Sequence, residues 1–275
     1  MAYAWTVTNA LPATAASYVW VSGPSDSTRA YMYDRRMGKQ FACTAASGGN
    51  TLNIDMGAAT SLKGLAFLNH NLASFGGTVT AQVQAATLSD YSNAADAKAI
   101  TTLDFTSPHA KDFVLQFPAV SKRYWRIIFT WSGSKTLKVG EVFGYATATA
   151  LTRKDIYGAS GDGHQIRVAS VESDNLEQRA YQMAGPRRSK RMTFSDLSTA
   201  ELLELEAIWL ATKGPINPVL FILSQNEVST AAAAADQDVM FGKLDLTDFS
   251  YTFPDFSRNA PPQLVLLNLA REVGA

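Results

Sequence analysis

The sequence predicts a mainly β protein of two domains, a β-sandwich followed by a second β-rich domain with one prominent lateral α-helix. Short runs rich in β-branched and aromatic residues recur along the chain, with turn residues between them. Helical periodicity is confined to a stretch near 198–213. Residues 146–153 are poor in bulky side chains, as linkers are. We therefore expect the domains at 1–146 and 151–275.

Composition limits the classes of function. A chain of 275 residues with 47% hydrophobic residues is long enough for two cores. The 24 basic and 24 acidic side chains balance, so no overall charge favours nucleic acid or an anionic membrane. No segment approaches the roughly 18 to 20 apolar residues of a membrane helix, and the N-terminus shows no secretory signal. The single Cys43 excludes an intramolecular disulfide, and we expect synthesis in a reducing cytoplasm.

The first domain is expected to consist of short strands. Their predicted positions are 18–24, a hairpin within 30–43, and 51–57, 62–72, 78–86, 112–118, 122–131 and 137–145. The alternation in these runs predicts one buried and one polar face on each strand. In 78–86, for example, Val79 and Val83 lie opposite Gln82 and Gln84.

The most β-rich stretch is 122–131. Trp125, Ile127 and Phe129 fall on one face of this run, opposite Tyr124 and Arg126. We expect the apolar face to pack against a second sheet. The Ser-Gly-Ser break that follows predicts that 122–131 and 137–145 pair as the central hairpin of the sandwich.

The second domain is expected to place one helix among strands. Ser198 and Glu201 have the spacing of a capping box, and Gly214-Pro215 ends the helix. Strands are predicted at 165–171, 187–197, 218–223, 239–246 and 249–253.

The first domain resembles a known family. Leu52-Asn-Ile-Asp-Met-Gly, Leu65-Ala-Phe-Leu-Asn-His-Asn-Leu, Ala81-Gln-Val-Gln-Ala-Ala, Arg123-Tyr-Trp-Arg-Ile and Val139-Gly-Glu-Val-Phe-Gly-Tyr are similar to successive strands of a discoidin-type, galactose-binding-like domain. The resemblance covers about residues 15 to 146. It implies an eight-stranded jelly roll with ligand-binding loops at one end. The sequence contains no recognisable match to the family's calcium-binding loop, although Asp34 and Glu141 lie in broadly suitable regions. Calcium is therefore compatible with the resemblance, and no cofactor is predicted.

The second domain resembles the ring-forming domain of phage distal tail and minor tail proteins over residues 151 to 275. The resemblance rests on the order of strands around one capped helix and on Lys190-Arg-Met-Thr-Phe before that helix. It implies a homo-oligomer, expected to be a ring, with tube, hub and tape-measure proteins as partners.

Few residues suggest catalysis or metal binding. His70, His109 and His164 have no acidic or cysteine partner at ligand spacing, so no metal site is predicted. The glycine-rich run 158–163 lacks the lysine of a phosphate loop and is expected to be a turn. The chain has no Gly-x-Ser-x-Gly motif, and its helical glutamates are expected to form a solvated face. We therefore predict that the protein is not an enzyme.

Two groups of residues remain as candidate sites. Phe75, Tyr91 and Trp131 border loops and are candidate platforms for a sugar ring, although each also suits a packing role. Arg187, Arg188, Lys190 and Arg191 form the densest charge run, which suits either a solvated edge strand or a contact between subunits. The run lacks the interleaved aromatics of a nucleic-acid site.

The sequence thus favours a structural subunit of a phage tail tip or baseplate, a distal or minor tail protein assembled in the host cytoplasm and located in the virion tail. Its jelly roll would face outward and would be able to contact a host-surface glycan, with no membrane insertion. The alternative is a carbohydrate-binding module of a secreted or surface protein. A third class, an enzyme acting on glycans, requires a carboxylate site that the sequence does not show.

Overall fold

The computed structural model describes residues 4–14, 17–22, 27–34, 39–45, 48–103, 112–152, 161–165, 168–172, 178–182, 187–194, 198–213, 216–222, 239–244 and 265–272. The chain forms two compact units. The first contains Met1, Thr8–Thr149 and Ile222–Met240, and the second contains Ala2–Val7, Ala150–Phe221 and Phe241–Ala275. Each unit is made of several separate segments of the chain, whereas each predicted domain is one continuous range. The domain boundaries 1–146 and 151–275 stay a prediction.

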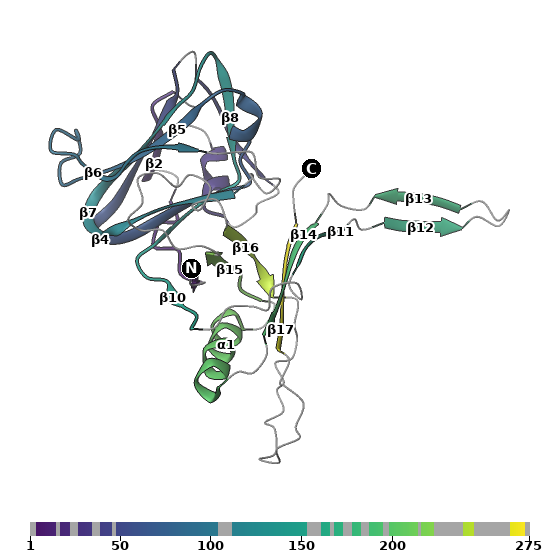
Figure 1. The fold of residues 1–275 in the computed structure, drawn as a ribbon. Coiled ribbons are helices and arrows are strands. Elements are labelled where there is room, and N and C mark those ends of the chain that lie inside the picture. Colours follow the sequence, from purple (N-terminus) through teal and green to yellow (C-terminus); the bar gives the residue numbers. More distant parts are fainter. Residues whose placement is uncertain are drawn as a thin grey trace. The chain divides into compact units, whose positions relative to one another are not determined.

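The first unit is built on a six-stranded sheet (Figure 1). Its order is β2 (Tyr18–Trp20), β4 (Asn50–Leu68), β7 (Asp112–Thr130), β5 (Val79–Ala86) and β6 (Ala95–Leu103), and β9 (Glu141–Tyr145) also pairs with β4. All of these pairs are antiparallel. The sheet is therefore organised around the two long central strands β4 and β7.

The β4–β7 ladder is interrupted near its middle. Its register shifts between Asp55 and Thr60, where Gly57 has a φ of 74°. Beyond the shift, the second half of β4 pairs with β9, while the first half pairs with β2. Phe67 and Phe129, from opposite halves of the ladder, meet edge to face with ring centroids 5.0 Å apart. The bent ladder therefore encloses part of the core by itself.

A second, two-stranded sheet completes the sandwich. It pairs β3 (Phe41–Ala45) with β8 (Lys135–Val139). Phe41 stacks on Trp20 of the larger sheet, with centroids 6.0 Å apart. Both sheets contribute to one apolar cluster, and its largest fully buried side chains include Trp20, Trp125, Phe41, Phe67, Phe113, Phe117 and Phe129. The short elements η2 (Ser27–Met32) and η3 (Leu72–Phe75) lie between strands in the sequence.

Two predicted pairings are wrong. The segments 122–131 and 137–145 do not form a central hairpin, because β7 pairs with β4 and β5, β8 with β3, and β9 with β4. The predicted hairpin within 30–43 is replaced by η2 and β3. The predicted faces of 122–131 are confirmed, since Trp125, Ile127 and Phe129 are buried.

The second unit is also β-rich, and α1 (Thr199–Thr212) is the one α-helix among the described residues. A seven-stranded sheet has the order β10 (Thr149–Ala150), β1 (Ala4–Thr6), β15 (Val219–Ile222), β16 (Val239–Leu244), β17 (Val265–Glu272), β14 (Arg187–Phe194) and β11 (Gly161–Gln165). β12 (Val168–Glu172) and β13 (Gln178–Gln182) form a separate hairpin (Figure 1). The mainly β class with one helix is thereby confirmed.

The predicted capping box of α1 is present. The Ser198 hydroxyl accepts a hydrogen bond from the Glu201 backbone N–H at 3.3 Å, and the Glu201 carboxylate accepts one from the Ser198 N–H at 2.7 Å. Lys213 ends the helix in the left-handed conformation. No helix in the described part of the chain is both long and apolar enough to span a membrane.

Candidate functional site

The outer face of the larger sheet carries a concentration of polar and aromatic side chains. On the first half of β4, on β5 and on the second half of β7, the side chains alternate between a buried inner face and a half-exposed outer face. We call the following residues the outer-face cluster: Asp55, Gln82, Gln84, Tyr91, Asp96, Arg123, Tyr124 and Arg126. They come from four neighbouring strands and from the loop between β5 and β6.

Strand register brings these residues together. Arg126 of β7 lies opposite Gln84 of β5, which in turn lies opposite Asp96 of β6. Asp55 of β4 lies opposite Tyr124 of β7. Because cross-strand neighbours have Cβ atoms roughly 5 Å apart, their side chains can bond directly.

A row of hydrogen bonds crosses three strands. Arg126 Nε donates to Gln84 Oε1 at 2.6 Å, and Gln84 Nε2 donates to Asp96 Oδ1 at 2.8 Å. Gln82 Nε2 donates to the same Asp96 oxygen at 2.9 Å. These bonds fix the amides and the guanidinium on a rigid sheet, and each group retains further donors or acceptors that can face a ligand.

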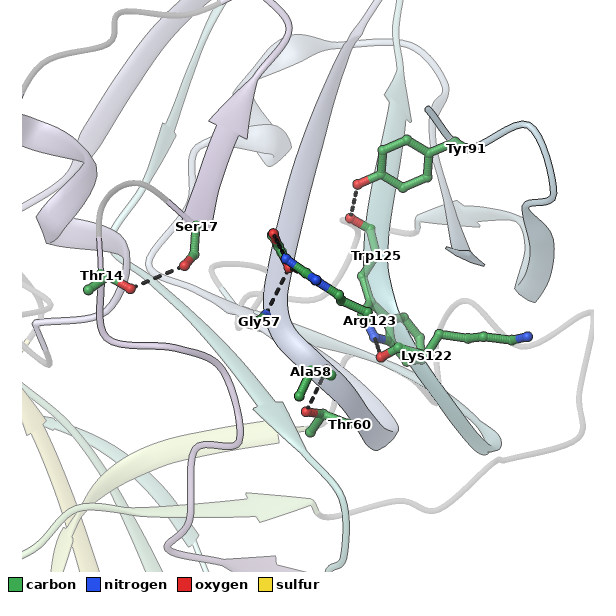
Figure 2. A network of polar contacts seen from close by, with 10 residues as sticks. Thr14, Ser17, Gly57, Ala58, Thr60, Tyr91, Lys122, Arg123 and Trp125 are labelled. Atoms are coloured by element: carbon green, nitrogen blue, oxygen red, sulfur yellow. Dashed lines mark hydrogen bonds and ion pairs between the residues drawn. The ribbon is translucent and has the colours of Figure 1, made fainter. Parts of the chain in front are cut away.

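Two tyrosines lie beside this row. Tyr91 has a φ of 59°, and its hydroxyl donates to the Trp125 carbonyl oxygen at 2.9 Å, as Figure 2 shows. Its ring meets Tyr124 edge to face with centroids 6.4 Å apart, and Arg126 Cζ lies 5.0 Å from its centroid. Burial raises the pKa of Tyr91 to about 12, so the hydroxyl stays protonated at neutral pH and remains a donor.

An ion pair lies at the end of the cluster where the β4–β7 ladder bends. Arg123 Nε and Nη2 donate to the two carboxylate oxygens of Asp55 at 2.9 and 3.0 Å. The hydrogen bond from Arg123 lowers the pKa of Asp55. Arg123 Cζ also lies 4.9 Å from the Tyr124 ring centroid, and Figure 2 shows Arg123 on the same strand as Trp125. The guanidinium therefore links the carboxylate to the tyrosine pair.

The cluster presents aromatic rings, amides, guanidinium groups and carboxylates on one surface. Arg123 and Arg126 balance Asp55 and Asp96 in charge. A surface of this kind can exchange several neutral hydrogen bonds at once while a ring packs against an apolar face of the ligand.

The three predicted sugar platforms lie in different environments. Tyr91 belongs to the outer-face cluster and is half-buried. Phe75 and Trp131 are 6% and 3% exposed, and their rings meet edge to face with centroids 5.0 Å apart. Both belong to the apolar core, so their rings pack against each other in this structure. The binding roles of all three stay predictions.

The predicted basic run lies in the first five residues of β14. This strand pairs with β11 on one side and β17 on the other, so the interpretation of Arg187, Arg188, Lys190 and Arg191 as a solvated edge strand is wrong. In the register, Arg187 lies opposite Glu272, and Arg188 opposite Arg271. The side chains of β14 lie outside the described part of the structure, and a subunit contact there stays a prediction.

Metal-binding groups are not concentrated in the described residues, where no three His, Cys, Asp or Glu side chains gather as a metal site would require. Of the two residues considered for calcium, Glu141 is fully buried on β9 and Asp34 is half-buried after η2.

Most of the cluster was missed by sequence reasoning. Asp55, Gln84 and Arg126 each appear in the sequence only as the polar side of a separate strand. The sequence does predict that three strands carry polar residues on their outer faces. It does not predict that these strands are neighbours, because strand order is not determined by the local sequence pattern.

Comparison with known proteins finds solved structures only, since no family model and no curated protein matches the chain. CpGH89CBM32-5 from Clostridium perfringens, in complex with GalNAc-β-1,3-galactose, is 11% identical, with a TM-score of 0.38 over 47% of this chain and 94% of that one. A Streptococcus pneumoniae fucose binding module is 14% identical, with a TM-score of 0.39 over 51% and 96%. The lectin domain of lectinolysin, complexed with Lewis B antigen, is 11% identical, with a TM-score of 0.38 over 50% and 95%.

Proposed function

We propose that the first unit is a carbohydrate-binding module and that it binds its glycan on the outer-face cluster. The observation that carries the proposal is the fixed row Arg126–Gln84–Asp96 beside the Tyr91–Tyr124 pair. A sugar ring offers hydroxyl groups that need paired donors and acceptors, and C–H faces that pack on aromatic rings.

The balance of charge favours a neutral ligand. The two guanidinium groups of the cluster are offset by two carboxylates, and Arg123 is already engaged by Asp55. A phosphate or polyanion site would present a surplus of cations. Neutral hydroxyl groups can bond to the remaining N–H groups of Arg126 and to the amides without that surplus.

Rigidity also supports binding at this surface. The side chains stand on strands of a packed sandwich and are held by hydrogen bonds to each other, so little conformational entropy is lost when a ligand binds. Tyr91 is held in the same way, because its hydroxyl is bonded to the main chain of β7.

The test is glycan-array screening of the full chain, followed by titration calorimetry with the best neutral oligosaccharide. Arg126→Ala removes the charged donor at one end of the row, and we expect affinity to fall about tenfold or more, as loss of a charge-assisted hydrogen bond implies. Tyr124→Ala removes a ring and is expected to have a similar effect. Lys138→Ala, an exposed cation on β8, is the matched control and should leave affinity unchanged.

A second variant distinguishes the sheet face from the loops. Ser132→Arg places a bulky side chain in the exposed turn after β7, where the jelly-roll resemblance would locate a ligand. Loss of binding in Ser132→Arg with full binding in Arg126→Ala would contradict the outer-face cluster but keep the carbohydrate function. Absence of binding to every glycan tested would contradict the function itself.

The predicted role as a phage tail-tip subunit stays a prediction, because neither the described residues nor the compared structures bear on it. A glycan-binding unit is compatible with that role and with the alternative of a secreted or surface protein. Copurification of the full chain with tail-tube or hub proteins would support the tail role.

A further inference from the structure

One register row crosses the five strands β2, β4, β7, β5 and β6 of the larger sheet. Val19 of β2 lies opposite Asn53 of β4, and Asn53 lies opposite Arg126 of β7. Arg126 lies opposite Gln84 of β5, which lies opposite Asp96 of β6. Because residues opposite one another in a ladder point to the same side of a sheet, all five side chains share the outer face. We call these residues the five-strand row.

The five-strand row is accessible to solvent over its whole length. Val19 is 42% exposed at one end, Asp96 is exposed at the other, and the three residues between them are half-buried. Neighbouring strands lie roughly 4.8 Å apart, so the row measures roughly 19 Å along the sheet. The hydrogen bonds that join Arg126, Gln84 and Asp96 occupy only the half on β7, β5 and β6.

The β2 end of the row is apolar. Val21, two residues after Val19, is 67% exposed, and its N–H donates to the Thr51 carbonyl oxygen at 2.9 Å, so the chain is still paired with β4 there. Single apolar side chains are normal on a protein surface, but these two valines are close together on one edge strand beside a polar row. They offer a contact for the C–H face of a sugar at the end of the row that has no charged group.

We propose that the ligand of the first unit is a linear neutral oligosaccharide of about four sugar units that lies along the five-strand row, across the strands. This inference rests on the proposed carbohydrate function and specifies its ligand. A pyranose ring is about as wide as the spacing between two neighbouring strands, so one sugar covers at most two residues of the row. Only a chain of several units reaches from Asp96 to Val19.

The two ends of the row bind different parts of such a chain. Asp96 receives both of its amide hydrogen bonds on Oδ1, so Oδ2 can accept hydrogen bonds from sugar hydroxyl groups. Arg126 bonds to Gln84 through Nε, so its two terminal nitrogens can donate to hydroxyl oxygens. Val19 and Val21 have no polar side-chain atoms and can contact only C–H groups. The polar end therefore fixes the register of the chain, and the apolar end adds affinity when the chain is long enough to reach it.

The experiment is titration calorimetry of the full chain with fragments of one to six units of the best neutral glycan. We expect affinity to rise about tenfold or more from one unit to four, because each added sugar gains contacts along the row, and then to level off. Equal affinity for one unit and for six would show recognition of a single sugar. That result would overturn this proposal and leave the carbohydrate function intact, whereas absence of binding to every glycan would contradict the function itself.

A variant at the apolar end tests where the chain lies. Val19→Arg should weaken binding of the tetrasaccharide about tenfold and leave binding of the disaccharide unchanged, because the shorter ligand occupies only the polar end. Arg126→Ala should weaken binding of both. Thr44→Arg, at an exposed position on β3 of the other sheet, is the matched control and should affect neither. Circular dichroism confirms that each variant is folded. Unchanged tetrasaccharide binding in Val19→Arg, or an equal loss with both fragments, would overturn the proposal.

Discussion

Phe113 and Phe129 lie near opposite ends of one strand, β7, yet their rings meet edge to face with centroids 6.4 Å apart. Both also contact Phe67 of β4. This meeting requires the β4–β7 ladder to bend over itself, which the register shift and Gly57 allow. The two longest strands therefore hold the core of the first unit and also present the outer-face cluster on their other side.

Phe129 is at the centre of this arrangement, and Phe129→Ala should destabilise the first unit by about 3–5 kcal/mol. Its ring contacts Trp20, Phe67 and Phe113, so truncation opens a cavity that the bent ladder cannot close. Urea unfolding followed by intrinsic fluorescence measures the change. Thr130→Ala, the exposed neighbour on the same strand, should lie within about 0.5 kcal/mol of the parent. Equal effects of the two substitutions would contradict the packing described.

The faces of β7 could be predicted from sequence, because burial alternates with every residue from Tyr124 to Trp131. Its partners could not. The short Ser-Gly-Ser turn favoured a hairpin with the following strand, but β8 pairs with β3, which lies far earlier in the chain. Local pattern specifies which side of a strand is apolar, whereas pairing between distant strands depends on how the whole core closes.

The same limit applies to the candidate site. Tyr91 could be identified because it is an aromatic residue in a polar loop. Its partner Arg126 could not be assigned to it, because they meet only when the loop after β5 folds back over β7. The capping box of Ser198 and Glu201 was predictable for the opposite reason, since its two members are neighbours in sequence.

Gly49 should not tolerate a side chain. Its φ is 123°, and a Cβ there would lie 2.0 Å from the backbone oxygen of Phe129, which cannot move without breaking the β4–β7 ladder. We expect Gly49→Ala to cost more than about 3 kcal/mol in the free energy of unfolding. Gly133→Ala is the control, because Gly133 also has a positive φ of 75° but no atom within 4 Å of its Cβ site. A smaller loss at Gly49 than at Gly133 would show that the close approach is absent.

The Asp55–Arg123 pair should make a small, pH-dependent contribution to stability. Arg123 lowers the pKa of Asp55 in the folded state, so the contribution is present above the unfolded pKa of about 3.9 and is lost as the pH falls through the folded pKa. Both side chains are partly exposed, at 39% and 44%, and the effect at neutral pH should not exceed about 1 kcal/mol. Asp55→Asn should therefore be less stable than the parent at pH 7, and the two unfolding curves should converge in acid. A difference that persists unchanged below the folded pKa would exclude the ion pair as its cause.

Cys43 should be unreactive in the folded protein. Its side chain is buried in the core, and burial raises the pKa of the thiol to about 11, although a hydrogen bond from Asn50 Nδ2 at 3.3 Å acts in the opposite direction. Because the thiolate is the reactive form, alkylation at neutral pH should be at least on the order of a hundredfold slower than in the urea-unfolded chain. Mass spectrometry of timed iodoacetamide reactions, with and without urea, measures both rates on the same single cysteine. The destabilised Phe129→Ala variant should react faster than the parent without urea, because local opening of the shared core exposes the thiol. Similar rates in the native and unfolded parent would place Cys43 at the surface and contradict the buried β3–β8 layer.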